Sequence, residues 1–123
     1  STNDADASFG EDSANSLFGK HIDASGDHDG DGTNDILVGA HLYGANKGHT
    51  YLLSGADHTN WTTGLSVGDE ALSFYEGAQG DTAGVMATFI DADDDGNLDI
   101  AIGADQDDNG ANNGGGLLFL YGN

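Results

Sequence analysis

The sequence predicts an all-β protein, and its composition and the spacing of its apolar residues lead to this prediction. Gly accounts for 21 of the 123 residues, Pro is absent, and Asp supplies most of the 22 acidic residues. Gly, Asp and Asn favour tight turns and disfavour helix interiors. The apolar residues form short blocks rich in Ile, Leu, Val, Phe and Tyr, with turn-forming residues between them. Short apolar blocks bounded in this way are typical of strands.

An internal repeat divides the chain into two similar parts. The segment Asp27–Ala40 matches Asp91–Ala104 at a spacing of 64 residues, including the alternating Asp residues and the closing Gly-Ala. Weaker echoes join Ser8–Phe9 to Ser73–Phe74 and Gly48–Leu52 to Gly116–Leu120. A repeat of this length that holds four strands fits one blade of a β-propeller, although common blades span about 40–50 residues.

We expect eight strands and no helix. The strands are expected near Ala7–Phe9, Phe18–Ile22, Asp35–Ala40, His49–Leu53, Ala71–Tyr75, Val85–Ile90, Asp99–Ala104 and Leu117–Tyr121. Three units follow from the repeat: 1–16, an outer strand that completes a neighbouring blade plus a loop; 17–80, a first four-stranded blade; and 81–123, a second blade without its own outer strand.

The charge of the chain excludes several functions. The acidic residues face only Lys20 and Lys47, there is no Arg, and the formal net charge is -20. No basic patch can be assembled, which argues against nucleic acid and anionic lipid as partners. The chain has no Cys, and no apolar run is long enough to insert into a membrane. A charge this large destabilises a compact state unless cations offset it.

Two acidic loops are the strongest functional signal. Asp27–Asp35 and Asp91–Asp99 both follow the pattern D-x-D-x-D-G-x-x-D. Ca²⁺ takes six to eight oxygen ligands, and alternating Asp residues in a tight loop can supply them. We therefore expect two Ca²⁺ ions per chain. The expected ligands are Asp27, Asp29, Asp31, Asp35 and the carbonyl of Thr33 in the first loop, and Asp91, Asp93, Asp95, Asp99 and the carbonyl of Asn97 in the second. Gly32 and Gly96 are expected to form the sharp turns.

Other calcium loops do not fit this pattern. An EF-hand needs a bidentate Glu at position 12 and flanking helices, but position 12 is Val38 in one loop and Ile102 in the other. Thrombospondin-type repeats carry cysteines, which this chain lacks, and glycine-rich β-rolls have a much shorter period.

Phe18-Gly19, the first acidic loop and Ile36–Ala40 together resemble an FG-GAP repeat, the blade unit of integrin α-subunit β-propellers and of related bacterial surface proteins. The second copy resembles it from Gly84 through Ala104. The resemblance implies a calcium loop between the first two strands of each blade, at one rim, with ligands bound on the opposite face. The chain departs from the motif at His41 and Asp105, where the family has Pro, and at Ala83, where it has Phe.

The expected function is a calcium-binding scaffold for adhesion or protein binding, located outside the cell or at a bacterial cell surface, and not an enzyme. The alternative is a carbohydrate-binding, lectin-like module or a non-catalytic part of a secreted enzyme. Candidates for a ligand face are Tyr43, Lys47, Trp61, Asp105, Asp107 and Asp108. The five His residues are expected to be surface or turn residues, since none is paired with a nearby nucleophile.

Two blades are too few to close a propeller, which usually has about four to eight. We expect a homo-oligomer in which three or four chains form a six- or eight-bladed ring, with the first strand of one chain pairing with the last strand of another. The alternative is that the sequence is part of a longer propeller. A protein or glycan is the expected ligand of the assembled module.

Overall fold

The computed structural model describes residues 5–108, 112 and 114–122 and is mostly β-structure, as predicted. Its strands are β1 (Phe9–Gly10), β2 (His21–Asp23), β3 (Ile36–Ala40), β4 (His49–Leu53), β5 (Leu65–Ser66), β6 (Ser73–Glu76), β7 (Ala83–Ile90), β8 (Asp99–Ala104) and β9 (Gly116–Leu120). The expectation of no helix is wrong in three short segments, α1 (Tyr43–Asn46), η1 (Gly55–Asn60) and α2 (Val67–Glu70). Each is no longer than six residues.

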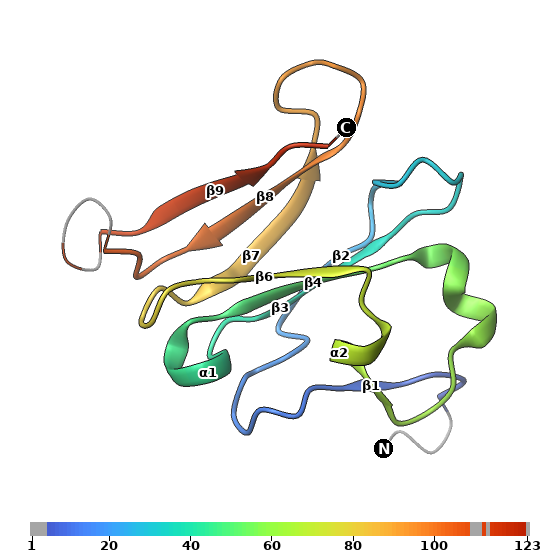
Figure 1. The fold of residues 1–123 in the computed structure, drawn as a ribbon, viewed down its shortest axis with the longest axis horizontal. Coiled ribbons are helices and arrows are strands. Elements are labelled where there is room, and N and C mark those ends of the chain that lie inside the picture. Colours follow the sequence, from blue (N-terminus) through green and yellow to red (C-terminus); the bar gives the residue numbers. More distant parts are fainter. Residues whose placement is uncertain (1–4, 109–111, 113, 123) are drawn as a thin grey trace.

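Two antiparallel sheets form the body of the molecule (Figure 1). The first has the order β2-β3-β4-β6, and the second has the order β7-β8-β9. Within each of these two sheets the strands lie in chain order, with β5 of another sheet between β4 and β6 along the chain, and every pair is antiparallel. Each of the eight predicted strands has a counterpart, although several boundaries are shifted. The outer edge of β9 has no partner strand among the described residues.

The N-terminal strand β1 pairs with β5 of the same chain, in parallel, over only two residues. Phe9 lies opposite Leu65 and Gly10 opposite Ser66. Ser8 extends this contact, because its N–H donates to the Thr62 carbonyl at 3.1 Å and its carbonyl accepts the Leu65 N–H at 3.0 Å. The sequence repeat did not reveal β5, which lies inside what appears from the sequence to be a long loop. β1 and β5 form a separate two-stranded sheet, and Phe9 of β1 packs on the first sheet.

The two faces of the first sheet are covered by different parts of the chain. Because side chains alternate along a strand, Leu37 points to one face of β3 and Val38 to the other. The first face packs on the second sheet and forms a core of Leu37, Leu52, Ala83, Ala87, Phe89, Ile100, Ile102 and Ala104. The second face forms a core of Val38, Ala40, Tyr51, Leu53 and Val67, flanked by Phe9, Phe18 and Trp61.

A backbone contact brings the two sheets together at two glycines. A Cβ placed on Gly39 of β3 would lie 2.1 Å from the carbonyl oxygen of Gly84 in β7. A Cβ placed on Gly84 would lie 2.5 Å from the carbonyl oxygen of His49. Neither position has space for a side chain, so only Gly allows the sheets to approach this closely. At Gly103, the repeat counterpart of Gly39, the nearest atom would be 3.7 Å away.

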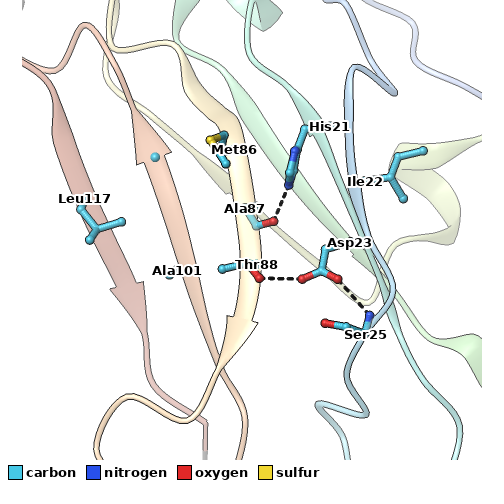
Figure 2. Close-up of a pocket in the computed structure, with 10 residues that line it drawn as sticks. His21, Ile22, Asp23, Ser25, Met86, Ala87, Thr88, Ala101 and Leu117 are labelled. Carbon is cyan, nitrogen blue, oxygen red and sulfur yellow. Dashed lines mark hydrogen bonds between the residues drawn. The ribbon is translucent and has the colours of Figure 1, made fainter.

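Hydrogen bonds between β2 and β7 form a polar seam beside this contact (Figure 2). His21 donates from Nε2 to the Ala87 carbonyl at 2.6 Å. Asp23 accepts from Thr88 Oγ1 at 2.7 Å and from the Phe89 N–H at 3.1 Å. Partial burial opposes ionisation of Asp23, but these bonds, with those from Ser25, outweigh it and lower the pKa of this carboxyl. The seam therefore favours a charged Asp23.

Gly39→Ala should reduce the free energy of unfolding by about 1–3 kcal/mol, because the added methyl group overpacks the contact with Gly84. Gly103→Ala is the matched control, since a Cβ there makes only ordinary contacts. Its effect should stay within about 0.5 kcal/mol. Urea unfolding of dilute protein measures both values. Equal values for the two variants would contradict the backbone contact.

Thr50→Val should stabilise the protein by about 1 kcal/mol. The Thr50 hydroxyl is buried between the two sheets and has no hydrogen-bond partner among the described residues. Val keeps the shape of the side chain and removes the unsatisfied polar atom. Thr50→Ser is the control, because it keeps the hydroxyl and should not stabilise. Thermal unfolding of the three proteins provides the comparison, and a lower melting temperature for Thr50→Val than for Thr50→Ser would count against this account.

Candidate metal centre

The two acidic loops occupy equivalent places in the two sheets. Asp27–Asp35 joins β2 to β3, and Asp91–Asp99 joins β7 to β8. Each loop therefore connects the first and second strands of its sheet. Both loops project from the same end of the molecule, where they are coloured cyan and orange (Figure 1).

Each loop gathers three carboxylates around one point. Oxygen atoms of Asp27, Asp29 and Asp35 lie within 4.8 Å of one another, and so do those of Asp91, Asp93 and Asp99. These six residues are among the ten expected ligands. Asp31 and Asp95 lie outside the two groups, and their carboxylates instead accept the backbone N–H of Thr33 and Asn97, each at 2.8 Å. The bonds from Asn97 lower the pKa of Asp95.

The same backbone hydrogen bonds shape both loops. The carboxylate of Asp27 accepts the N–H groups of Asp31 at 3.1 Å and Gly32 at 2.8 Å. Its counterpart Asp91 accepts those of Asp95 and Gly96, both at 3.1 Å. The turns at Gly32 and Gly96 have φ values of 93° and 90°, a region that Gly adopts readily. Position for position, the two loops are folded alike around their carboxylates.

The last Asp of each loop anchors it to the protein body. Asp35 and Asp99 are 0% and 1% exposed. Asp35 accepts the N–H groups of His28 at 2.8 Å and Gly55 at 3.1 Å. Asp99 accepts those of Ala92 at 2.8 Å and Gly122 at 2.7 Å. Each buried carboxylate thus fixes the start of its own loop and also the chain that follows the third strand of the sheet.

No basic side chain of the described residues neutralises these loops. In the described part of the chain, the Lys47 ion pair and the His49 hydrogen bond both go to the carboxylate of Glu76. Loss of hydration raises the pKa of Asp29, and repulsion from Asp35, Asp31 and Asp27 adds to the effect. The gathered donors are all carboxylate oxygens, which are the ligands of hard cations such as Ca²⁺ and Mg²⁺. Chemically, the residues present fit a hard divalent cation.

His28 connects the first loop to the second. Its Nδ1 lies 2.6 Å from the carbonyl oxygen of Leu98. Its ring stacks on that of Phe89, with the two ring centroids 6.2 Å apart. A carbonyl only accepts, so Nδ1 carries the proton in this bond. A Cβ placed on Gly26 would lie 2.4 Å from Leu98 Cδ1, which shows how closely the loops pack. The sequence does not predict this contact, because the partners are 70 residues apart.

Two of the histidines expected to be surface or turn residues are buried, His49 in β4 and His41 in a turn. His49 is 4% exposed and His41 is 8% exposed. His49 donates from Nε2 to Glu76 at 2.8 Å, and its Nδ1 lies 2.9 Å from the Tyr51 hydroxyl. Burial raises the pKa of Tyr51, so the phenol stays protonated. Its hydroxyl therefore donates the hydrogen bond to Nδ1 of His49. Alternation along β4 would have placed His49 on the same face as the buried Tyr51.

The residues proposed for a ligand face are spread over several local contacts. The ring of Tyr43 stacks on His49 at 3.6 Å, and Trp61 meets Phe9 edge-on at 5.0 Å. Lys47 forms an ion pair with Glu76 at 2.8 Å. Asp105 accepts a hydrogen bond from Thr82, Asp107 is buried and Asp108 is exposed. Within the described residues, these three Asp side chains form no metal-binding group of the kind seen in the loops.

Comparison with known proteins finds no match to a protein-family model or to a curated protein sequence. No helix in the described residues has the length and apolar character needed to cross a membrane.

His28→Ala should lower the melting temperature, because it removes the hydrogen bond and the ring contact between the loops. The expected loss is about 1 kcal/mol. His28→Asn is the control, because its amide nitrogen can replace Nδ1 as the donor and should restore part of the stability. Thermal unfolding in calcium-free buffer isolates this effect from cation binding. Equal melting temperatures for His28→Ala and the unaltered protein would show that the contact adds nothing.

Glu76 should stabilise the protein in a pH-dependent way. Hydrogen bonds from Lys47 and then from His49 lower its pKa below the ordinary value of 4.5. A lowered pKa means that the stabilisation is present above the unfolded value and is lost as the pH falls through the folded value. The difference in melting temperature between the unaltered protein and Glu76→Gln should therefore be present well above the unfolded pKa of 4.5 and shrink as the pH falls below it. Glu70→Gln, which affects neither the Lys47 nor the His49 contact of Glu76, should show no such trend. A pH-independent difference for Glu76→Gln would refute the stabilising role of the Glu76 carboxylate.

Proposed function

We propose that the chain is a calcium-binding β-propeller repeat module that acts outside the cell, or at a bacterial cell surface, as a scaffold for adhesion or protein binding. The observation that carries this proposal is the duplication of one acidic loop. Both copies gather three carboxylates, share their backbone hydrogen bonds and lie at the same end of neighbouring sheets. A single acidic turn would carry far less weight.

One Ca²⁺ ion in each loop is the proposed occupancy. The gathered carboxylates would hold the ion. Asp31 and the Thr33 carbonyl would complete its coordination in the first loop, and Asp95 and the Asn97 carbonyl would do so in the second loop. The cation would supply positive charge where three carboxylates are gathered. Binding in a loop would also stabilise a distant segment, because the buried Asp35 and Asp99 are each hydrogen-bonded both to their loop and to such a segment.

The sheet order supports the propeller blade as the unit. The first sheet has four antiparallel strands in chain order, and the second has three. The resemblance to FG-GAP repeats places the calcium loop between the first and second strands, where both loops lie. No catalytic role is proposed, because the acidic residues that cluster are assigned to cation binding. A protein or a glycan is the proposed ligand class.

Three or four copies of the chain are proposed to form a six- or eight-bladed ring. The outer edge of β9 is unpaired among the described residues. β1, which pairs with β5 over two residues, is the strand proposed to cover it. In the ring, β1 would exchange its two-residue pairing with Leu65–Ser66 for β9 of a neighbouring copy. In a longer propeller, a further blade of the same chain would take that place.

Calcium should raise the melting temperature. At 100-fold excess over Kd, one site adds about 2.7 kcal/mol of stability. Extracellular calcium modules bind at about 10⁻⁴–10⁻³ M, so about 10–100 mM Ca²⁺ provides that excess. Mg²⁺ should stabilise less, because it prefers a smaller octahedral shell. Differential scanning calorimetry in Ca²⁺, Mg²⁺ and chelator tests this, and identical transitions in all three would end the calcium proposal.

A calorimetric titration of the variants Asp29→Asn and Asp93→Asn distinguishes the two loops. Both carboxylates are exposed, so their removal should spare the fold. Calorimetric titration should give two ions for the unaltered chain and one for each variant. Asp57→Asn, in η1, is the matched control and should keep both ions.

A further inference from the structure

The second sheet presents a largely apolar outer face that no strand of the described residues covers, although Asp23 of β2 contacts it through a hydrogen bond from Thr88. Register pairs Met86 with Gly103 and Leu117, and Thr88 with Ala101 and Phe119, so these six side-chain positions share one face. We refer to them as the outer face. Met86 and Leu117 are each 63% exposed. Two adjoining hollows of about 530 and 460 Å³ both include Met86, Gly103 and Leu117 in their walls. The wall of the first also includes His21, Ile22 and Asp23 of β2 (Figure 2).

The internal repeat shows what kind of surface covers such a face. Ala101 and Gly103 are the counterparts of Leu37 and Gly39 at the spacing of 64 residues. In the first sheet, the face containing Leu37 and Gly39 is covered by the second sheet, chiefly through β7. Gly39 allows the backbone of Gly84 to approach, but nothing within the described residues comes as close to Gly103. The chain therefore contains the covered and the uncovered version of one surface.

The matching surface lies on β2, the repeat counterpart of β7. Gly19 corresponds to Gly84 at a spacing of 65 residues, and both have a φ of 84°. Ile22 corresponds to Ala87 in the same register. Ala87 is buried between the sheets, whereas Ile22 is 59% exposed. A Cβ placed on Gly19 would meet no atom within 4 Å, so this position is open.

We propose that β2 of a second copy of the chain docks on the outer face, with Gly103 of one copy against Gly19 of the next. This contact would repeat the contact of Gly39 with Gly84 within the chain. Ile22 is exposed beside the covering of the first sheet by Phe9 and Trp61, so docking of β2 does not depend on whether β1 keeps its partner strand or exchanges it. The proposal rests on the ring under the proposed function and identifies its interface.

The new interface differs from the one inside the chain in its chemistry. Within the chain, His21 and Asp23 of β2 form hydrogen bonds to β7 (Figure 2). Their counterparts on the outer face are Met86 and Thr88. Contact between copies therefore depends more on burial of apolar surface and less on hydrogen bonds. It is also head-to-tail, because two different surfaces meet, and such contacts close into rings or extend into filaments.

The experiment measures the mass of the full chain by light scattering over a range of concentrations in millimolar Ca²⁺. The unaltered protein should associate. Gly103→Leu should weaken association at least about tenfold by filling the place of the incoming backbone, since tenfold corresponds to about 1.4 kcal/mol. Ile22→Asn should do the same from the other surface. Leu72→Asn is the control, because Leu72 is an exposed apolar residue outside both surfaces and its replacement should leave association unchanged.

A mixing step tests the head-to-tail geometry. Gly103→Leu leaves the β2 surface intact, and Ile22→Asn leaves the outer face intact. The two variants, monomeric alone, should combine when mixed and stop at twice 12.5 kDa. Circular dichroism of each variant verifies that it is folded. If only one variant folds, Gly103→Leu still tests the outer face, or Ile22→Asn still tests the β2 surface.

A calcium-loaded chain that stays monomeric at all concentrations would overturn the proposed docking, as would association that neither substitution weakens. These outcomes leave the calcium function intact, because titration of the same samples measures ion binding separately. Association through these surfaces in a protein that binds no Ca²⁺ would support the docking and refute the calcium scaffold.

Discussion

The arrangement of this protein depends on two buried carboxylates, Asp35 and Asp99. Each stands at the end of an acidic loop and the start of a central strand, and each is hydrogen-bonded to two backbone segments. A buried charge is costly unless it is hydrogen-bonded or paired. The backbone donors meet part of that requirement and bring the loop, the strand and the following segment together. What remains is a concentration of negative charge at one end of the molecule.

The acidic loops and most of the strands could be predicted from the sequence because their causes are local. The alternating Asp residues, the turn at Gly32 and the apolar run after it act within a few residues of one another. The duplication then supplied a check, since the same local pattern had to fold in the same way twice. Asp31 and Asp95 lie outside the carboxylate groups, so their role as ligands stays a prediction.

Contacts between distant residues could not be predicted from the sequence. The bonds of His28 to Leu98 and of Asp23 to Thr88 depend on how one sheet packs on the other, which no short pattern specifies. The burial of His49 has a weaker local signal, in its alternation with Tyr51 along β4. The strand β5 and the three helical turns are too short for periodicity to reveal. Their positions follow from what they cover, chiefly the second face of the first sheet.

The polar seam shows that the two repeats have ceased to be interchangeable. His21 and Asp23 belong to the first repeat, and the second carries Met86 and Thr88 in their place. An array made by copying single repeats would place mismatched surfaces side by side. Copying the pair would preserve both contacts between neighbouring sheets, the hydrogen-bonded one within a pair and the apolar one between pairs, in alternation. The unit on which duplication could act without loss is therefore the pair, so that growth of such an array would proceed in even numbers.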